Sequence, residues 1–107
     1  MNSGAIATEL KDLDVLIAED DFIVALDLAQ SVDDLGGRVL GPVAAVSEGL
    51  ALLQGSQPDL TFLDMQLQDG FVTPLALALN RRNVPFALVT GYQGEELKHI
   101  PRNMLFG

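Results

Sequence analysis

Cysteine is absent from the 107-residue sequence, and histidine occurs once, at His99. Disulfides, thiolate metal sites and thiol catalysis are therefore excluded, and a cluster of histidine ligands cannot form. Basic residues are few, since six lysines and arginines stand against fifteen acidic residues, for a formal net charge of -9. This excess repels polyanions, so we expect no direct binding to nucleic acid. It favours cations or a protein partner with a basic face, although most of the acids should only solvate the surface.

Long apolar runs are also absent, and none approaches the roughly 18 residues of a membrane span. Residues 1–11 lack the basic and long apolar regions of a secretory signal. We therefore expect a soluble cytoplasmic protein without membrane contact. The chain is 49% hydrophobic and 20% charged, which suits one folded domain. Residues 1–12 are interpreted as a polar lead-in and residues 13–107 as the domain.

Short apolar runs alternate with segments of helical periodicity along the chain. The expected strands are Leu13–Ala18, Arg38–Leu40, Leu60–Leu63, Phe86–Val89 and Asn103–Phe106. The expected helices are Asp20–Leu35, Val46–Leu53, Thr73–Arg82 and a short one near Glu95–His99. Gly41-Pro42 should end the second strand, and a loop should run from Asp64 through Gly70. This alternation predicts an α/β fold with a five-stranded parallel sheet and helices on both faces.

Acidic side chains follow two of these strands at the point where each ends. Glu19, Asp20 and Asp21 follow the first strand, Asp64 follows the third, and the hydroxyl residue Thr90 follows the fourth. The carboxyl ends of parallel strands share one sheet edge, where ligands of open α/β sheets bind. If the first and third strands are neighbours, the carboxylates converge and repel one another. A hard divalent cation such as Mg²⁺, which takes oxygen ligands, would resolve that repulsion.

Such a site can carry out phosphoryl chemistry. Asp64 suits a carboxylate nucleophile that forms an acyl phosphate, and Thr90 suits a hydroxyl that neutralises charge on the transferring oxygens. Plainer roles stay open. Capping the following helix could be the whole role of Asp20 or Asp21. A threonine at a strand end is often structural.

The acids and the threonine lie in the segments VLIAEDD at 15–21, TFLDMQL at 61–67 and VTGY at 89–92. These three segments resemble the receiver family of response regulators, which has a flavodoxin-like, CheY-like fold. The likeness runs from Val15 to Phe106, and it is closest to single-domain receivers of the FATGUY type. The motifs of that subgroup resemble Gly41-Pro42-Val43, Pro74, Arg82-Asn83-Val84-Pro85-Phe86 and Thr90-Gly91-Tyr92.

The resemblance implies a role for each matching residue. Asp64 would be the phosphoacceptor, Asp20 a direct Mg²⁺ ligand, and Glu19 a ligand acting largely through water. Gln66 would offer its backbone carbonyl to the metal, and Thr90 would contact a phosphoryl oxygen and move toward it on activation. Asp21 falls just after the acid pair and is interpreted as the acid that starts the helix.

The sequence also departs from the family pattern. The catalytic lysine expected after the fifth strand is missing because the sequence stops at Gly107, so we expect a truncated end that lacks this lysine and the last helix. Leu105 occupies the place of the switch aromatic, which makes Tyr92 a candidate for that role. Gln68 replaces a proline that is common after the phosphoacceptor.

The implied function is a non-enzymatic switch in a two-component phosphorelay. A sensor histidine kinase or a phosphotransfer protein would donate the phosphoryl group, and the output would be a change in protein contacts. A homodimer is a further association left open. One alternative is a pseudo-receiver that binds partners but takes no phosphoryl group. Another is an aspartate-nucleophile phosphatase, which is disfavoured because Gln66 replaces the second acid typical of those enzymes.

Overall fold

The computed structural model describes residues 9–89 of the chain. The elements, in order, are β1 (Asp14–Ala18), α2 (Phe22–Asp34), β2 (Arg38–Val43), α3 (Val46–Gly55), β3 (Leu60–Leu63), β4 (Gln66–Leu67), β5 (Gly70–Phe71), α4 (Thr73–Arg81) and β6 (Phe86–Leu88). Four of the strands form a parallel sheet in the order β2-β1-β3-β6. The expected fifth strand and the short helix at 95–99 lie outside the described residues.

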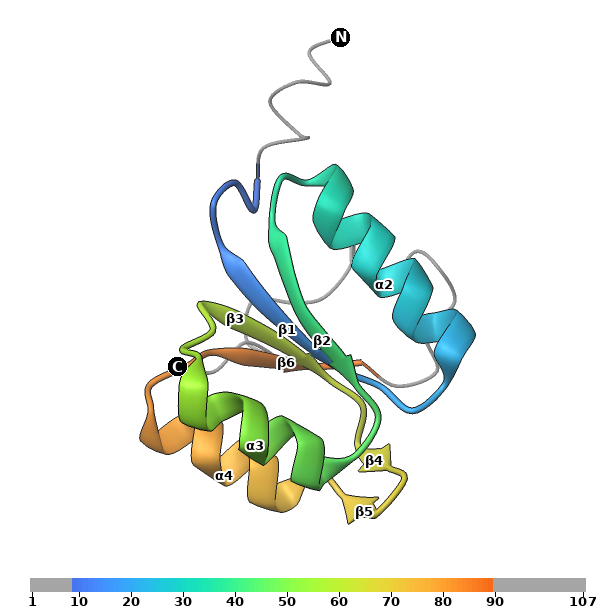
Figure 1. Ribbon diagram of the computed structural model, residues 1–107, viewed down its shortest axis with the longest axis vertical. Helices are drawn as coiled ribbons and strands as arrows, with labels where there is room; N and C mark the ends of the chain where they lie inside the picture. The colour runs from blue at the N-terminus through green and yellow to red at the C-terminus, as the bar shows by residue number, and fades with distance from the viewer. Residues whose placement is uncertain (1–8, 90–107) are drawn as a thin grey trace, which may run out of the picture.

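Helices cover both faces of the sheet, as predicted. Figure 1 shows α2 on one face and α3 with α4 on the other. The central strand β1 is buried on both sides, so its apolar residues alternate between two cores. Val15 and Ile17 pack with the α2 residues Leu28 and Val32. Residues on the opposite face of β1 pack with α3 and α4. A near-continuous apolar strand is the expected result of this double burial.

The second strand is longer than the sequence analysis predicted. It continues through a cis Gly41-Pro42 bond to Val43, which pairs with Ala18 of β1. The register shifts between Leu16 and Ala18, as in a β-bulge, and Gly41 adopts a positive φ of 93° there. Proline is tolerated because β2 is the outer strand of the described sheet, and glycine suits the left-handed backbone of a bulge. The prediction that Gly41-Pro42 ends this strand was therefore wrong.

The segment after Asp64 was expected to be a loop, but it contains a small antiparallel hairpin of β4 and β5. Each strand is two residues long, which is too short to show a period in the sequence. Leu67 of β4 is buried in the core shared with α3 and α4.

Within residues 9–89, no helix is both long and apolar enough to cross a bilayer.

Candidate functional site

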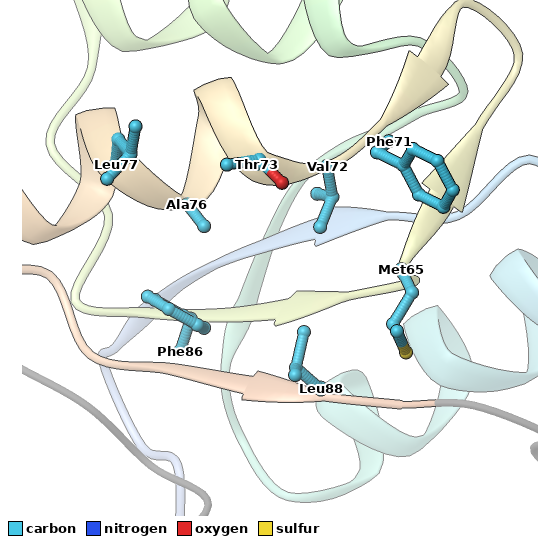
Figure 2. A pocket seen from close by; sticks show the side chains of 8 residues that line it. All are labelled: Met65, Phe71, Val72, Thr73, Ala76, Leu77, Phe86 and Leu88. Carbon is cyan, nitrogen blue, oxygen red and sulfur yellow. The ribbon is translucent and has the colours of Figure 1, made fainter.

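An apolar cavity and a cluster of acidic side chains are the two places in the described domain that we consider as sites. The first is an apolar cavity of about 370 Å³ between α4, β6 and the hairpin. Figure 2 shows Ala76 of α4 directed toward Phe86 and Leu88 of β6, with Leu77 farther along α4 and Met65 at one end. No lining residue in the described part of the chain has a titratable side chain. This cavity therefore offers no titratable group for acid or base chemistry, and Thr73 supplies its only side-chain hydroxyl among the lining residues.

The second is the acidic cluster at the carboxyl end of the sheet, and backbone pairing explains its position. Strands β1 and β3 are parallel neighbours with Ala18 opposite Leu63. The Asp64 N–H donates to the Ala18 carbonyl (2.9 Å), and the Glu19 N–H donates to the carbonyl of Val43 at the end of β2 (2.9 Å). The residues that directly follow the two strands are thereby held side by side. The predicted adjacency of the first and third strands is confirmed.

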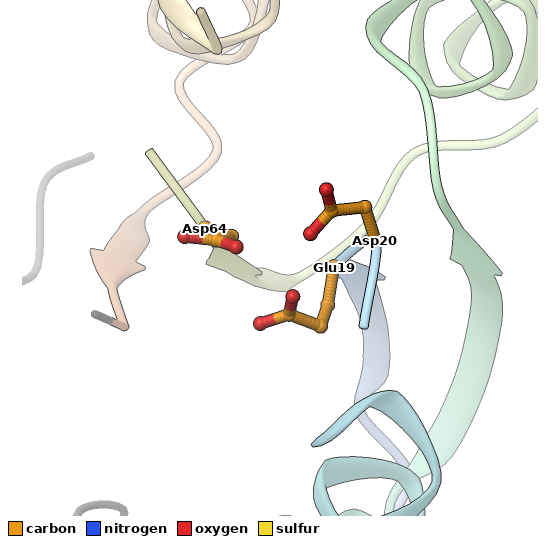
Figure 3. Close-up of side chains that lie close together, drawn as sticks. All are labelled: Glu19, Asp20 and Asp64. Carbon is orange, nitrogen blue, oxygen red and sulfur yellow. The ribbon is translucent and has the colours of Figure 1, made fainter. Parts of the chain in front are cut away.

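Three carboxylates converge there. One carboxylate oxygen from each of Glu19, Asp20 and Asp64 lies within 4.8 Å of the others. Figure 3 shows Glu19 and Asp20 extending from the end of β1 toward the same space as Asp64. Glu19 is only 6% exposed, Asp64 is half-buried and Asp20 is exposed. The cluster therefore runs from the protein interior to solvent.

Asp21 has a different role, as the sequence analysis anticipated. It is the N-cap of α2, and its Oδ1 accepts hydrogen bonds from the N–H groups of Ile23 (2.9 Å) and Val24 (3.1 Å). Its own N–H donates to Oε2 of Glu19 (2.9 Å). Since the cap is Asp21, the helix-capping role left open for Asp20 is excluded, and Asp20 is free to face the cluster.

The electrostatics of the cluster follow from burial and like charge. Burial raises the pKa of the Glu19 carboxyl from 4.5 to about 7; the nearby carboxyls of Asp64 and Asp20 add to the rise, while the Asp21 N–H opposes it. Within residues 9–89, the ion pairs are those of Arg38 with Asp12 and Asp14, at the other end of β1. The cluster thus has no partner cation in the described part of the chain. Oxygen ligands with excess negative charge fit Mg²⁺ or another hard divalent ion.

The remaining predicted site residues are placed less completely. Gln66 opens β4, two residues after Asp64, and its side chain is exposed. Thr90 and Tyr92 lie outside the described residues. The residue before Thr90, Val89, donates its N–H to the Leu63 carbonyl (2.8 Å), next to Asp64. Sequence reasoning missed Asp69, whose carboxylate binds the start of α3. The only sequence signal is an acid beside Gly70, which by itself suggests no more than a turn.

A parallel α/β sheet with paired acids after β1 and a single acid after the neighbouring β3 defines a receiver-like class of domain. No family model matches the sequence. Curated relatives that match it include the transcriptional regulatory protein PdtaR of Mycobacterium tuberculosis and the phyllosphere-induced regulator PhyR of Methylorubrum extorquens. PdtaR is 28% identical over 91 residues, which are 83% of this chain and 44% of PdtaR. PhyR is 33% identical over 82 residues, which are 74% of this chain and 31% of PhyR.

Solved structures of response regulators also resemble this domain. The response regulator PhyR from Brucella abortus has a TM-score of 0.73 and 30% identity over 89% of this chain and 39% of its own. PhyR from Bartonella quintana in complex with the anti-sigma factor NepR has a TM-score of 0.68 and 27% identity over 80% of this chain and 36% of its own. The chain therefore contains a receiver domain of the response-regulator family. It spans less than half the length of these relatives.

Proposed function

We propose that this domain accepts a phosphoryl group on Asp64 and uses the change in charge to alter its protein contacts. The observation that supports the proposal is the convergence of Glu19, Asp20 and Asp64 within 4.8 Å, without a partner cation among residues 9–89. Three carboxylates left in this arrangement repel one another, and Glu19 is buried as well. A group of this kind is more consistent with a binding site than with a structural feature.

Mg²⁺ is the ion we propose for this site. Asp20 and Asp64 would bind it through carboxylate oxygens, Glu19 would act largely through water, and Gln66 would offer its backbone carbonyl. The ion would neutralise charge on the phosphoryl oxygens. Burial and the neighbouring carboxyls raise the pKa of Glu19, and a bound cation would lower it again.

The chemical step belongs to Asp64. Its carboxylate oxygen attacks the phosphorus of the donor, the bond from phosphorus to the donor's leaving atom breaks with its electron pair, and an aspartyl phosphate forms. Half-burial leaves the Asp64 side chain accessible to a donor while β3 fixes its position. The hydroxyl of Thr90 would then contact a phosphoryl oxygen, and Tyr92 remains a candidate for the accompanying switch. Both lie outside the described residues.

The donor we propose is a sensor histidine kinase or a phosphotransfer protein. Beside the cluster, the start of α2 exposes two large apolar side chains, Phe22 and Ile23, each 71% exposed. An exposed apolar surface that directly follows Asp20 and Asp21 in the chain suits a protein donor better than a small molecule. The output would also be a protein contact, either with a target or with a second copy. Among the homologues, PhyR is found in complex with NepR. We further propose a cytoplasmic location.

Phosphorylation assays would distinguish the proposal from its alternatives. The protein should become labelled by acetyl phosphate, or bind beryllofluoride, only when Mg²⁺ is present. A folded protein that takes neither would instead be a pseudo-receiver. Rapid, repeated turnover of a small phosphate ester would indicate a phosphatase. The double variant Phe22→Ser, Ile23→Ser should be labelled by acetyl phosphate at the wild-type rate. Transfer of the phosphoryl group from a phosphotransfer protein to this variant should be slower.

A further inference from the structure

Asp69, in the β4–β5 hairpin, caps a helix that is distant from it in sequence. Its Oδ1 accepts a hydrogen bond from the Val46 N–H (2.6 Å), and its Oδ2 accepts one from the Ser47 N–H (3.0 Å). These are the first N–H groups of α3, which have no acceptor within the helix. The N-cap residue, Ala45, makes no side-chain hydrogen bond to the helix. Asp69 therefore supplies from the hairpin what a polar N-cap residue usually supplies.

A third hydrogen bond strengthens the same junction. The Gln68 N–H donates to the Ala44 carbonyl (3.0 Å), so the hairpin is bound to the corner before α3 by backbone as well as side chain. On the helix side, Oε1 of Glu48 accepts from the Ala44 N–H (2.9 Å), which holds the corner against α3. The hydrogen bonds that the Asp69 carboxylate accepts from the N–H groups of Ser47 and Val46 lower its pKa. Asp69 is thus ionised and engaged under ordinary conditions.

The corner between β2 and α3 also contacts the other side of the acidic cluster. Val43, the last residue of β2 before this corner, accepts the hydrogen bond from the Glu19 N–H (2.9 Å). The hairpin bound by Asp69 starts at Gln66, two residues after Asp64. One corner therefore holds both the segment that carries Glu19 and the segment that follows Asp64.

We propose that Asp69 is a positioning residue for the acidic cluster, and that it sets the distance between the chain after Asp64 and the acids of β1. This rests on the proposed function, in which Asp64 and the backbone at Gln66 bind Mg²⁺. Leu67 anchors the hairpin in the core independently of Asp69. Loss of Asp69 should therefore loosen the placement of Gln66 and Gln68 while the sheet stays intact.

The test compares Asp69→Ala with Asp59→Ala. Asp59 is a matched control because its Oδ2 also accepts a backbone N–H from a remote residue, Asp14 (2.8 Å), but at the opposite end of the sheet. Mg²⁺ affinity, labelling by acetyl phosphate and Tm are measured for both variants. Asp69→Ala should weaken Mg²⁺ binding by roughly tenfold or more, as removal of an outer-shell partner does. Asp59→Ala should lower Tm without changing Mg²⁺ affinity.

Two further results separate positioning from general damage. Saturating Mg²⁺ should restore labelling of Asp69→Ala close to the wild-type rate, because every reacting group is still present. Asp69→Asn, which keeps one acceptor oxygen, should bind Mg²⁺ with intermediate affinity. Equal Mg²⁺ affinity in wild type and Asp69→Ala, or equal losses in Asp69→Ala and Asp59→Ala, would overturn the inference.

Failure of the proposed function would give a different result, since wild type itself would neither bind Mg²⁺ nor become labelled. Hydrogen exchange of the backbone at 64–68 then still tests the positioning role, because it requires no metal or phosphoryl group. Faster exchange there in Asp69→Ala, but not in Asp59→Ala, supports the role. Unchanged exchange contradicts it.

Discussion

The two ends of β1 place acidic side chains in opposite electrostatic settings. At the start of the strand, Asp14 pairs with the guanidinium of Arg38 (2.7 Å), which also reaches Asp12. At its end, Glu19 and Asp20 face Asp64. No ion pair to these three acids is found within residues 9–89. The acids at one edge of the sheet therefore have an arginine of the same domain as a partner, whereas those at the other edge would need a cation from outside. This difference distinguishes a solvated surface from a candidate site.

The largest expected effect separates the two edges by reactivity. Asp64→Asn should abolish labelling by acetyl phosphate with Mg²⁺, because the amide cannot act as the nucleophile. Asp14→Asn, an equal change of charge at the other end of the sheet, should be labelled at the wild-type rate. Gel electrophoresis at acidic pH or intact-mass spectrometry measures the labelling of both variants. Labelling that persists in Asp64→Asn would assign the phosphoacceptor to another residue.

The second prediction concerns pH. The pKa of Glu19 is raised in the folded state to about 7, so the folded protein holds this proton more tightly than the unfolded chain. The resulting stabilisation is complete below about 4.5 and is lost as pH rises through about 7, at about 1.4 kcal/mol per unit of pKa shift. Urea denaturation without metal should show this decline. Glu19→Gln should flatten it, and a decline of the same size in that variant would assign the effect to another group.

The third prediction is that the same substitution changes the free energy of unfolding in opposite directions at the two ends of β1. Asp64→Asn should raise the free energy of unfolding of the metal-free protein at pH 8, by about 1 kcal/mol, because it removes a like charge from the cluster. Asp14→Asn should lower it, because it takes the partner from Arg38. Denaturation curves at low ionic strength provide the comparison. The same sign at both ends would show that the cluster is not under electrostatic strain.

The smallest effect is expected at Arg38. Its side chain is exposed, and exposed ion pairs contribute little to stability. Arg38→Gln should therefore cause only a slight fall in Tm, with Mg²⁺ affinity and labelling unchanged. A marked loss of Mg²⁺ affinity would mean that the two ends of β1 are coupled and cannot be treated as separate regions.

The sequence predicted those features that depend on strand order and local pattern. Leu60–Leu63 was located with its bounds correct, because a short apolar run lies between Pro58 and Asp64. The meeting of Glu19 with Asp64 followed from parallel strands that share an edge. The continuation of β2 past Gly41-Pro42 was missed, since that dipeptide usually ends a strand and only its outer position in the described sheet permits it.

The role of Asp69 could not be predicted from the sequence, for a different reason. Its carboxylate accepts hydrogen bonds from Val46, which is 23 positions away in the sequence, and from Ser47, which is 22 positions away. Neither Asp69 nor the start of α3 has a local pattern that indicates the other. Only the packed structure brings the hairpin to the helix, so an acid beside a glycine could not be distinguished from an ordinary turn residue.

The central claim is that the carboxylates at the end of β1 and β3 lack their own counter-charge and therefore take a divalent cation. Calorimetric titration of the metal-free protein with Mg²⁺, in parallel with Asp20→Asn and Asp14→Asn, tests it directly. The account predicts one site in wild type and in Asp14→Asn, with protons released below pH 7 as Glu19 ionises, and a strongly weakened site in Asp20→Asn. Absence of binding in the folded wild-type protein, or binding that Asp20→Asn leaves unchanged, would contradict it.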